Sequence, residues 1–145
     1  SNITFDFVKD VIWPRWQSGQ VAVSLDDVLR FLKQAAAEHE EILTWKESSR
    51  TKIARNTLAA LRDFRLLIGA RNKKIQKPLL PNKTALHLLK MLRGKGLENS
   101  RVLSADEWKL FLLSKDDVAR ILTALAQERL IQFEKVGSAV TLDIL

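Results

Sequence analysis

The chain has 145 residues, enough for one domain or two small ones, and it has no cysteine, which excludes disulfide bonds and thiolate metal sites. With 46% hydrophobic residues but only 5 glycines and 3 prolines, it should form a packed core of helices more readily than a sheet-rich fold. The net charge is +7, no apolar run is long enough to cross a bilayer and no signal peptide is visible, so we expect a soluble, cytoplasmic protein without membrane contact.

Two helices are predicted at the start of the chain. Apolar residues at helical spacing indicate a helix over 5–13, which Pro14 should end because proline cannot donate the backbone hydrogen bond. A second helix should begin after Ser24, since Asp27 stands where a capping box needs an acceptor, and should run to about residue 38. A short apolar element is expected over 41–45.

A basic helix and a hairpin are predicted next. Ser48 or Ser49 can cap this helix, which should run to about residue 66 with Gly69 just past its end. Its buried stripe is predicted to consist of Ala54, Leu58, Leu61 and Phe64. The short, turn-rich segment 68–78 is typical of an irregular hairpin.

The second half is predicted to repeat the order helix, short helix, helix, hairpin. Asn82 should cap a helix through residue 93, Ser104 a shorter one through 113, and Ser114 a third over 115–129. Alternating residues over 130–135 and 139–144 indicate the closing hairpin. Several residues recur at a spacing of 64: Leu58, Ala60, Leu61, Arg65 and Leu66 return as Leu122, Ala124, Leu125, Arg129 and Leu130.

This order of elements is that of a winged helix-turn-helix. We therefore predict a mainly α fold built from two tandem winged-helix-like modules with short β-hairpins. The first domain should span 1–81 and the second 82–145.

Nothing in the sequence indicates catalysis. His39 and His87 lie far apart without metal-ligand spacing, and the adjacent carboxylates stand at or near predicted helix starts, where they favour the helix dipole. There is no glycine-rich phosphate loop and no serine elbow. We expect no enzymatic activity, no metal and no cofactor.

Positive charge is concentrated in the middle of the chain. Residues 44–77 hold 10 basic and 2 acidic residues, and 78–101 hold 5 and 1, whereas 1–43 and 102–145 each carry a net negative charge. Such a separation of positive from negative charge along the chain is typical of a protein that attracts a polyanion. Basic helices also occur as solvated faces and as docking sites for acidic proteins.

The basic helix and hairpin hold the predicted site. Polar positions at three- and four-residue steps lie away from the apolar stripe, so one helix face can pack while the other meets a ligand. Arginine can bond guanine, asparagine adenine, and lysine phosphates, and the hairpin would straddle the backbone as a wing. The predicted contact residues are Arg50, Lys52, Arg55, Asn56 and Arg62 on the helix and Arg71, Lys73, Lys74 and Lys77 on the hairpin.

The second half lacks this polarity, because its third helix opens with Lys115, Asp116 and Asp117, and carboxylates would repel phosphates. We expect this half to pack on the first or to bind a partner, with an exposed hairpin edge that can pair with another chain.

Stretches spread over nearly the whole chain resemble the BrxA family, small accessory proteins of bacteriophage-exclusion (BREX) defence systems. They are residues 7–16, 50–67, 85–89 and 108–113. The resemblance implies a bacterial cytoplasmic protein that acts beside a methyltransferase and ATPases, with DNA as its ligand and Arg50, Lys52, Arg55, Asn56 and Arg62 as contacts. It also implies a fold alternative, the all-helical bundle of the NusB type.

The leading hypothesis is thus a non-enzymatic accessory protein of anti-phage defence that grips double-stranded DNA. One alternative is an RNA-binding, antitermination-like module on the same surface. Another is an adaptor whose basic face docks an acidic protein among the other phage-defence proteins. A homodimer would fit either role.

Overall fold

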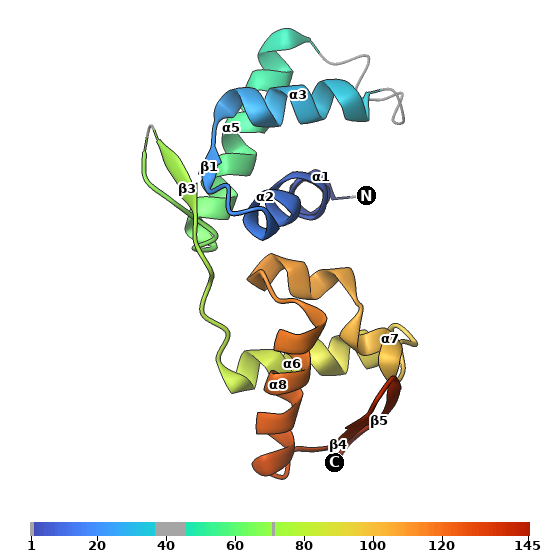
Figure 1. Ribbon diagram of the computed structural model, residues 1–145. Helices are drawn as coiled ribbons and strands as arrows, with labels where there is room; N and C mark the ends of the chain where they lie inside the picture. Colours follow the sequence, from blue (N-terminus) through green and yellow to red (C-terminus); the bar gives the residue numbers. More distant parts are fainter. Residues whose placement is uncertain (1, 37–45, 71) are drawn as a thin grey trace. The chain divides into compact units, whose positions relative to one another are not determined.

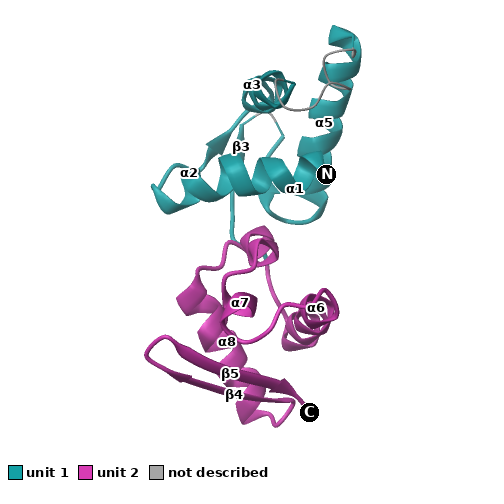
Figure 2. Ribbon diagram, turned by 90° about the vertical axis from the view of Figure 1, so that its right-hand side faces the viewer, with its two compact units in different colours: residues 1–78 teal, residues 79–145 magenta. Residues whose placement is uncertain are grey.

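The computed structural model describes residues 2–36, 46–70 and 72–145 (Figure 1). The fold is mainly helical, as the composition predicts, with two small antiparallel sheets that distinguish it from an all-helical bundle. The chain divides into two compact units, Ser1–Pro78 and Leu79–Leu145 (Figure 2). None of the helices in the described ranges is long and apolar enough to cross a membrane.

Unit 1 opens with a helical run that passes through Pro14. α1 (Ile3–Phe7) leads into a π-helical turn (Val8–Ile12) and then α2 (Trp13–Gln17). The prediction that Pro14 ends the helix is wrong. The Trp13 N–H donates to the Val8 carbonyl, five residues back, and Pro14 then falls in the first turn of α2. At that position its missing N–H costs little, and the wider π turn accommodates its ring.

The second helix starts as predicted. α3 (Leu25–Ala35) has a capping box, in which the Ser24 hydroxyl accepts the Asp27 N–H at 3.3 Å and the Asp27 carboxylate accepts the Ser24 N–H at 2.8 Å. The helix ends at Ala35, earlier than expected. The apolar element predicted over 41–45 lies outside the described residues.

The basic helix is α5 (Glu47–Asp63). It begins one residue before Ser48, with Lys46 at the N-cap, so neither Ser48 nor Ser49 caps it. Its buried residues are Ala54, Thr57, Leu58 and Leu61. Phe64, predicted to be buried, is 39% exposed because the helix ends at Asp63 and the stripe ends with it.

The predicted hairpin of unit 1 is present and belongs to a larger sheet. β2 (Leu67–Ile68) and β3 (Lys73–Ile75) pair antiparallel, and β1 (Ala22–Val23) adds a third strand in the order β1-β3-β2. Gly69 closes the turn with φ +105°, and a Cβ there would lie 2.5 Å from the Asn72 carbonyl oxygen. Only glycine fits this turn.

Unit 2 begins with two helices whose starts differ from prediction. α6 (Asn82–Gly94) has Asn82 as its first residue, and the Asn82 amide donates to the Glu128 carboxylate at 2.9 Å where a cap was expected. α7 (Ser100–Leu103) precedes Ser104, whose hydroxyl donates to the carbonyls of Ser100 and Arg101. Ser104 therefore ends one helix where the sequence predicted that it begins another.

The core of unit 2 surrounds a buried tryptophan. A 3₁₀ helix (Asp106–Phe111) carries Trp108, which is 1% exposed and donates its indole N–H to the Val102 carbonyl at 2.8 Å. α8 (Lys115–Gln127) follows, capped by Ser114 as predicted. The closing hairpin, β4 (Ile131–Val136) and β5 (Ala139–Ile144), has the predicted position and pairs Ile131 with Ile144.

The two helix-to-strand junctions, 64 residues apart, share one geometry. Arg65 after α5 and Arg129 after α8 both take the left-handed conformation, with φ +74° and +62°. In each, the next residue's N–H donates five residues back, Leu66 to Leu61 and Leu130 to Leu125. The recurrence in the sequence thus corresponds to a recurring helix C-cap that leads into a hairpin.

Candidate nucleic-acid interface

The exposed side of α5 carries cations that no described residue neutralises. Lys52, Arg55, Asn56 and Arg62 are exposed, while Ala54, Leu58 and Leu61 pack inward. The three cations make no ion pair or hydrogen bond within the part of the chain that the structure describes. With Lys73 of β3, these four α5 residues are called the basic face below.

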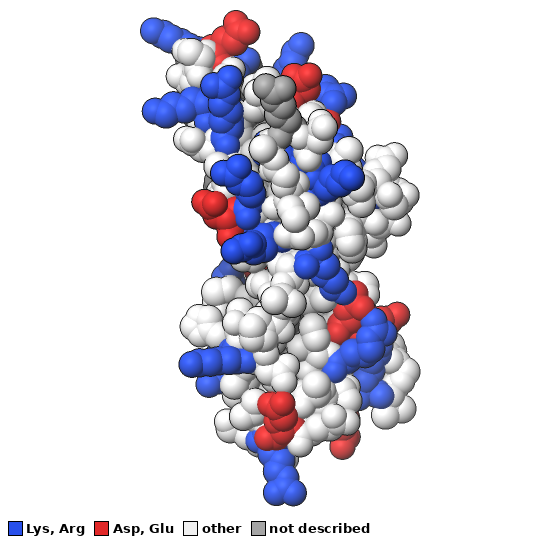
Figure 3. Space-filling model, turned by 90° about the vertical axis from the view of Figure 1, so that its left-hand side faces the viewer, with Lys and Arg blue, Asp and Glu red and all other residues white. Residues whose placement is uncertain are grey.

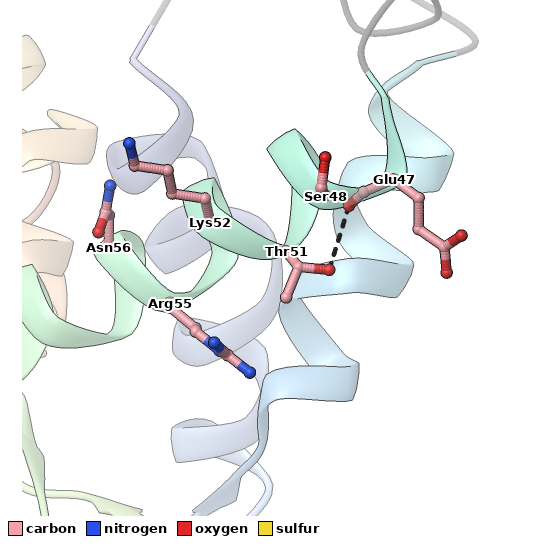
Figure 4. Close-up of a pocket in the computed structure, with 6 residues that line it drawn as sticks. All are labelled: Glu47, Ser48, Thr51, Lys52, Arg55 and Asn56. Atoms are coloured by element: carbon pink, nitrogen blue, oxygen red, sulfur yellow. Dashed lines mark hydrogen bonds between the residues drawn. The ribbon is translucent and has the colours of Figure 1, made fainter.

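A shallow depression of about 570 Å³ lies along the first turns of α5 (Figure 4). It is lined by Glu47, Ser48, Thr51, Lys52, Arg55 and Asn56. The Thr51 hydroxyl donates to the Glu47 carbonyl at 3.1 Å, so it is held against the helix. The Glu47 carboxylate points away from Lys52 and Arg55 (Figure 4), which leaves the positive potential of the depression in place.

A second depression, of about 260 Å³, joins the helix to the hairpin. Its lining among the described residues is Leu25, Arg55, Leu58, Ala59, Arg62 and Lys73, which include no carboxylate. The Lys73 ammonium donates to the Ala70 carbonyl at 2.6 Å, which orients the side chain and leaves two more N–H donors. Three cations from two elements therefore surround one apolar floor.

The structure separates the predicted site residues into groups. Arg50 is half-buried and lies in line with Ala54 and Leu61, on the packing side of α5. Lys74 is exposed on the side of β3 opposite Lys73, because successive strand residues point to opposite faces. Lys77 is exposed and lines neither depression, and Arg71 lies outside the described residues.

The start of α3 supplies a lining residue that the sequence did not indicate. Leu25 reaches the second depression because Asp27, only 8% exposed, fixes this junction. Arg15 donates to the two Asp27 oxygens at 2.7 and 2.8 Å and to the Ala22 carbonyl at 3.1 Å, and Arg30 donates to Asp27 at 2.6 Å. The Arg15–Asp27 pair thus links α2, β1 and α3.

Arg15 and Asp27 each favour the charged form of the other. The hydrogen bonds from Arg15 hold the pKa of Asp27 well below its ordinary value, against the opposing effect of burial. The same contact raises the pKa of Arg15. Arg15 is therefore committed to Asp27 and does not contribute an available cation.

Unit 2 presents no comparable basic surface. Asp116 and Asp117 open α8, Arg120 pairs with Asp117, and Lys109 pairs with Asp106 at 2.7 Å. On the face that Figure 3 shows, Lys and Arg gather over the upper part, which is unit 1, with a few carboxylates among them, and both charges are mixed over unit 2. No cluster of three metal-ligating side chains occurs in the described ranges; His39 lies outside them.

Comparison with known proteins identifies one family. The family model described as BrxA matches residues 1–92, which cover all of unit 1 and most of α6. No curated protein and no solved structure matches the chain.

Proposed function

The chain belongs to the BrxA family, which associates it with BREX systems, and on this basis we propose that it is a non-enzymatic accessory protein that binds duplex DNA through unit 1. It would act in the bacterial cytoplasm beside other phage-defence proteins. The observation that carries the proposal is the second depression, where Arg55, Arg62 and Lys73 meet without a carboxylate.

The order of elements in unit 1 supports a winged-helix mode of binding. Helix, strand, helix, helix and hairpin follow one another, and the sheet order β1-β3-β2 places the hairpin beside the strand before α3. In such modules the last helix enters the major groove and the hairpin contacts the backbone. α5 would then be the recognition helix and β2–β3 the wing.

The roles of the side chains follow from their chemistry. We expect Lys52, Arg62 and Lys73 to contact phosphates along the groove edges, and small Ala59 would permit close approach of the helix. We expect Arg55 and Asn56, which line the first depression, to contact base edges. Because most of these groups suit phosphates, sequence preference should be weak. The narrow major groove of A-form RNA would not admit α5, so DNA should be preferred.

The test is fluorescence anisotropy with a random-sequence duplex of about 30 base pairs, long enough to span several helical turns. The variant Arg55→Glu/Arg62→Glu reverses two exposed cations of the basic face. The control Lys83→Glu/Lys90→Glu reverses two exposed cations of α6, with the same change in net charge. Circular dichroism checks that both remain folded.

We expect the α5 variant to lose binding and the α6 variant to retain most of it. Equal losses would mean that net charge, and not the basic face, determines binding. Tighter binding of duplex RNA than of duplex DNA would favour the RNA-binding alternative. No binding of the wild type at low salt would exclude the proposal and favour docking of an acidic protein.

A further inference from the structure

The two edges of the β4–β5 hairpin in unit 2 differ in whether their outward-facing backbone groups have hydrogen-bond partners. The Leu145 N–H donates to the Leu130 carbonyl, and this register makes Phe133 and Leu142 a pair whose backbone groups point away from each other. On the β5 side these groups are occupied: the Leu142 carbonyl accepts from Arg93 at 2.6 Å, and the Leu142 N–H donates to the Asn99 amide oxygen at 3.3 Å. At Leu142 the β5 edge is therefore closed by side chains.

The β4 edge is open. The outward N–H and C=O groups of Phe133 and Lys135 have no hydrogen-bond partner in the described part of the chain. Figure 2 shows β4 as the outer strand of the hairpin, with β5 nearer to α7. Val136, at the end of β4, is 78% exposed. An extended edge with free donors and acceptors is a template for another strand.

The sequence of β4 suits pairing with a second copy of itself. An antiparallel twofold pair aligns outward-facing backbone groups whichever residue of β4 lies at its centre, so the side chains that face each other decide the register. Centred on Phe133, the pair places Phe133 opposite Phe133 and Gln132 opposite Glu134, without like charges. Centred on Glu134, it would place two carboxylates opposite each other, which is unfavourable.

We propose that two copies of the chain associate through β4, antiparallel and centred on Phe133, to form a four-stranded sheet across the dimer. This interaction surface is independent of the basic face and does not rest on DNA binding. A few backbone hydrogen bonds and one aromatic pair should give a weak dimer, observed at tens to hundreds of micromolar.

The first test is sedimentation equilibrium of the full chain for the wild type, Lys135→Pro and Lys135→Ala. Proline removes the outward N–H of Lys135 while the bonds of the β4–β5 ladder, which lie at Gln132 and Glu134, remain. Alanine keeps the N–H and removes only the side chain. We expect proline to weaken the dimer about tenfold or more and alanine to leave it nearly unchanged.

The second test changes exposed side chains of β4 and leaves every backbone donor and acceptor in place. Gln132→Glu should weaken association about threefold or more, because it places a carboxylate opposite Glu134 of the other copy. Adding Glu134→Lys should restore wild-type association or exceed it. A wild type that stays monomeric at millimolar concentration would overturn the proposal, as would equal effects of proline and alanine or failure of the double variant to rescue.

Discussion

Replacing Asp27 with asparagine tests whether the Asp27 carboxylate, through its pair with Arg15, holds α2, β1 and α3 together. The side chain is 8% exposed and accepts N–H groups from Arg15, Ser24 and Arg30 at 2.6–2.8 Å. Asparagine keeps one acceptor oxygen but turns an NH₂ group toward the Arg15 guanidinium. Breaking a buried pair costs about 3–5 kcal/mol, and since Arg15 is 26% exposed we expect about 2–3 kcal/mol here.

A matched control comes from unit 2. Asp117 occupies the same position of a capping box with Ser114 and pairs with Arg120 three residues on, but it is 23% exposed. Asp117→Asn should therefore cost only about 1 kcal/mol. Hydrogen exchange read by mass spectrometry along a urea series reports each unit separately. Equal losses in the two variants would refute the special role of the Arg15 pair.

The Arg15–Asp27 pair also predicts how the stability difference between the wild type and Asp27→Asn depends on pH. Because the pKa of Asp27 is lowered in the folded state, its contribution is complete above the unfolded pKa, about 4, and is lost as the pH falls below it. The stability difference between wild type and Asp27→Asn should shrink by about 1 kcal/mol between pH 5 and pH 3. A difference that does not change over this range would contradict the assignment of the low pKa.

Three further measurements test the site and the cores. If Lys52, Arg62 and Lys73 contact phosphates, DNA affinity should fall on the order of 40-fold between about 50 and 200 mM salt, and Arg62→Gln should reduce the logarithmic salt slope by about 0.9. Arg65→Gly and Arg129→Gly should each stabilise their own unit by about 0.5–1 kcal/mol in urea unfolding, because glycine adopts a positive φ without strain. A loss of stability at either site would exclude the shared C-cap. Trp108→Phe should destabilise unit 2 by about 2–3 kcal/mol, since it leaves the Val102 carbonyl without its donor; an unchanged unfolding midpoint would contradict that contact.

Features set by local chemistry could be predicted from the sequence. Ser24 and Ser114 each precede an aspartate at the third helical position, and both form capping boxes. The last hairpin follows from alternation around Gly137, and the cations of α5 follow from helical spacing alone. In each case the residues that determine the structure lie within a few positions of one another.

Features set by distant contacts could not be predicted. β1 is two residues long and exists because β3, fifty residues later, pairs with it. Lys73 and Lys74 point to opposite faces of the sheet, and its strand register decides which of them lies beside α5. Arg15 pairs with Asp27 because α3 begins just before Asp27. The helix continues through Pro14 because a π turn precedes it, and that turn has no signature in the sequence.

The start of α5 departs from the pattern of α3 and α8, and the departure fits its proposed role. α3 and α8 place paired aspartates in the first turn, where the helix dipole favours anions. α5 has no side-chain cap and follows a single Glu47 with Arg50 and Lys52. Cations beside the positive end of a helix reduce its stability, and a bound polyanion would offset that cost. We therefore expect DNA to protect the first turns of α5 from hydrogen exchange more than the starts of α3 or α8.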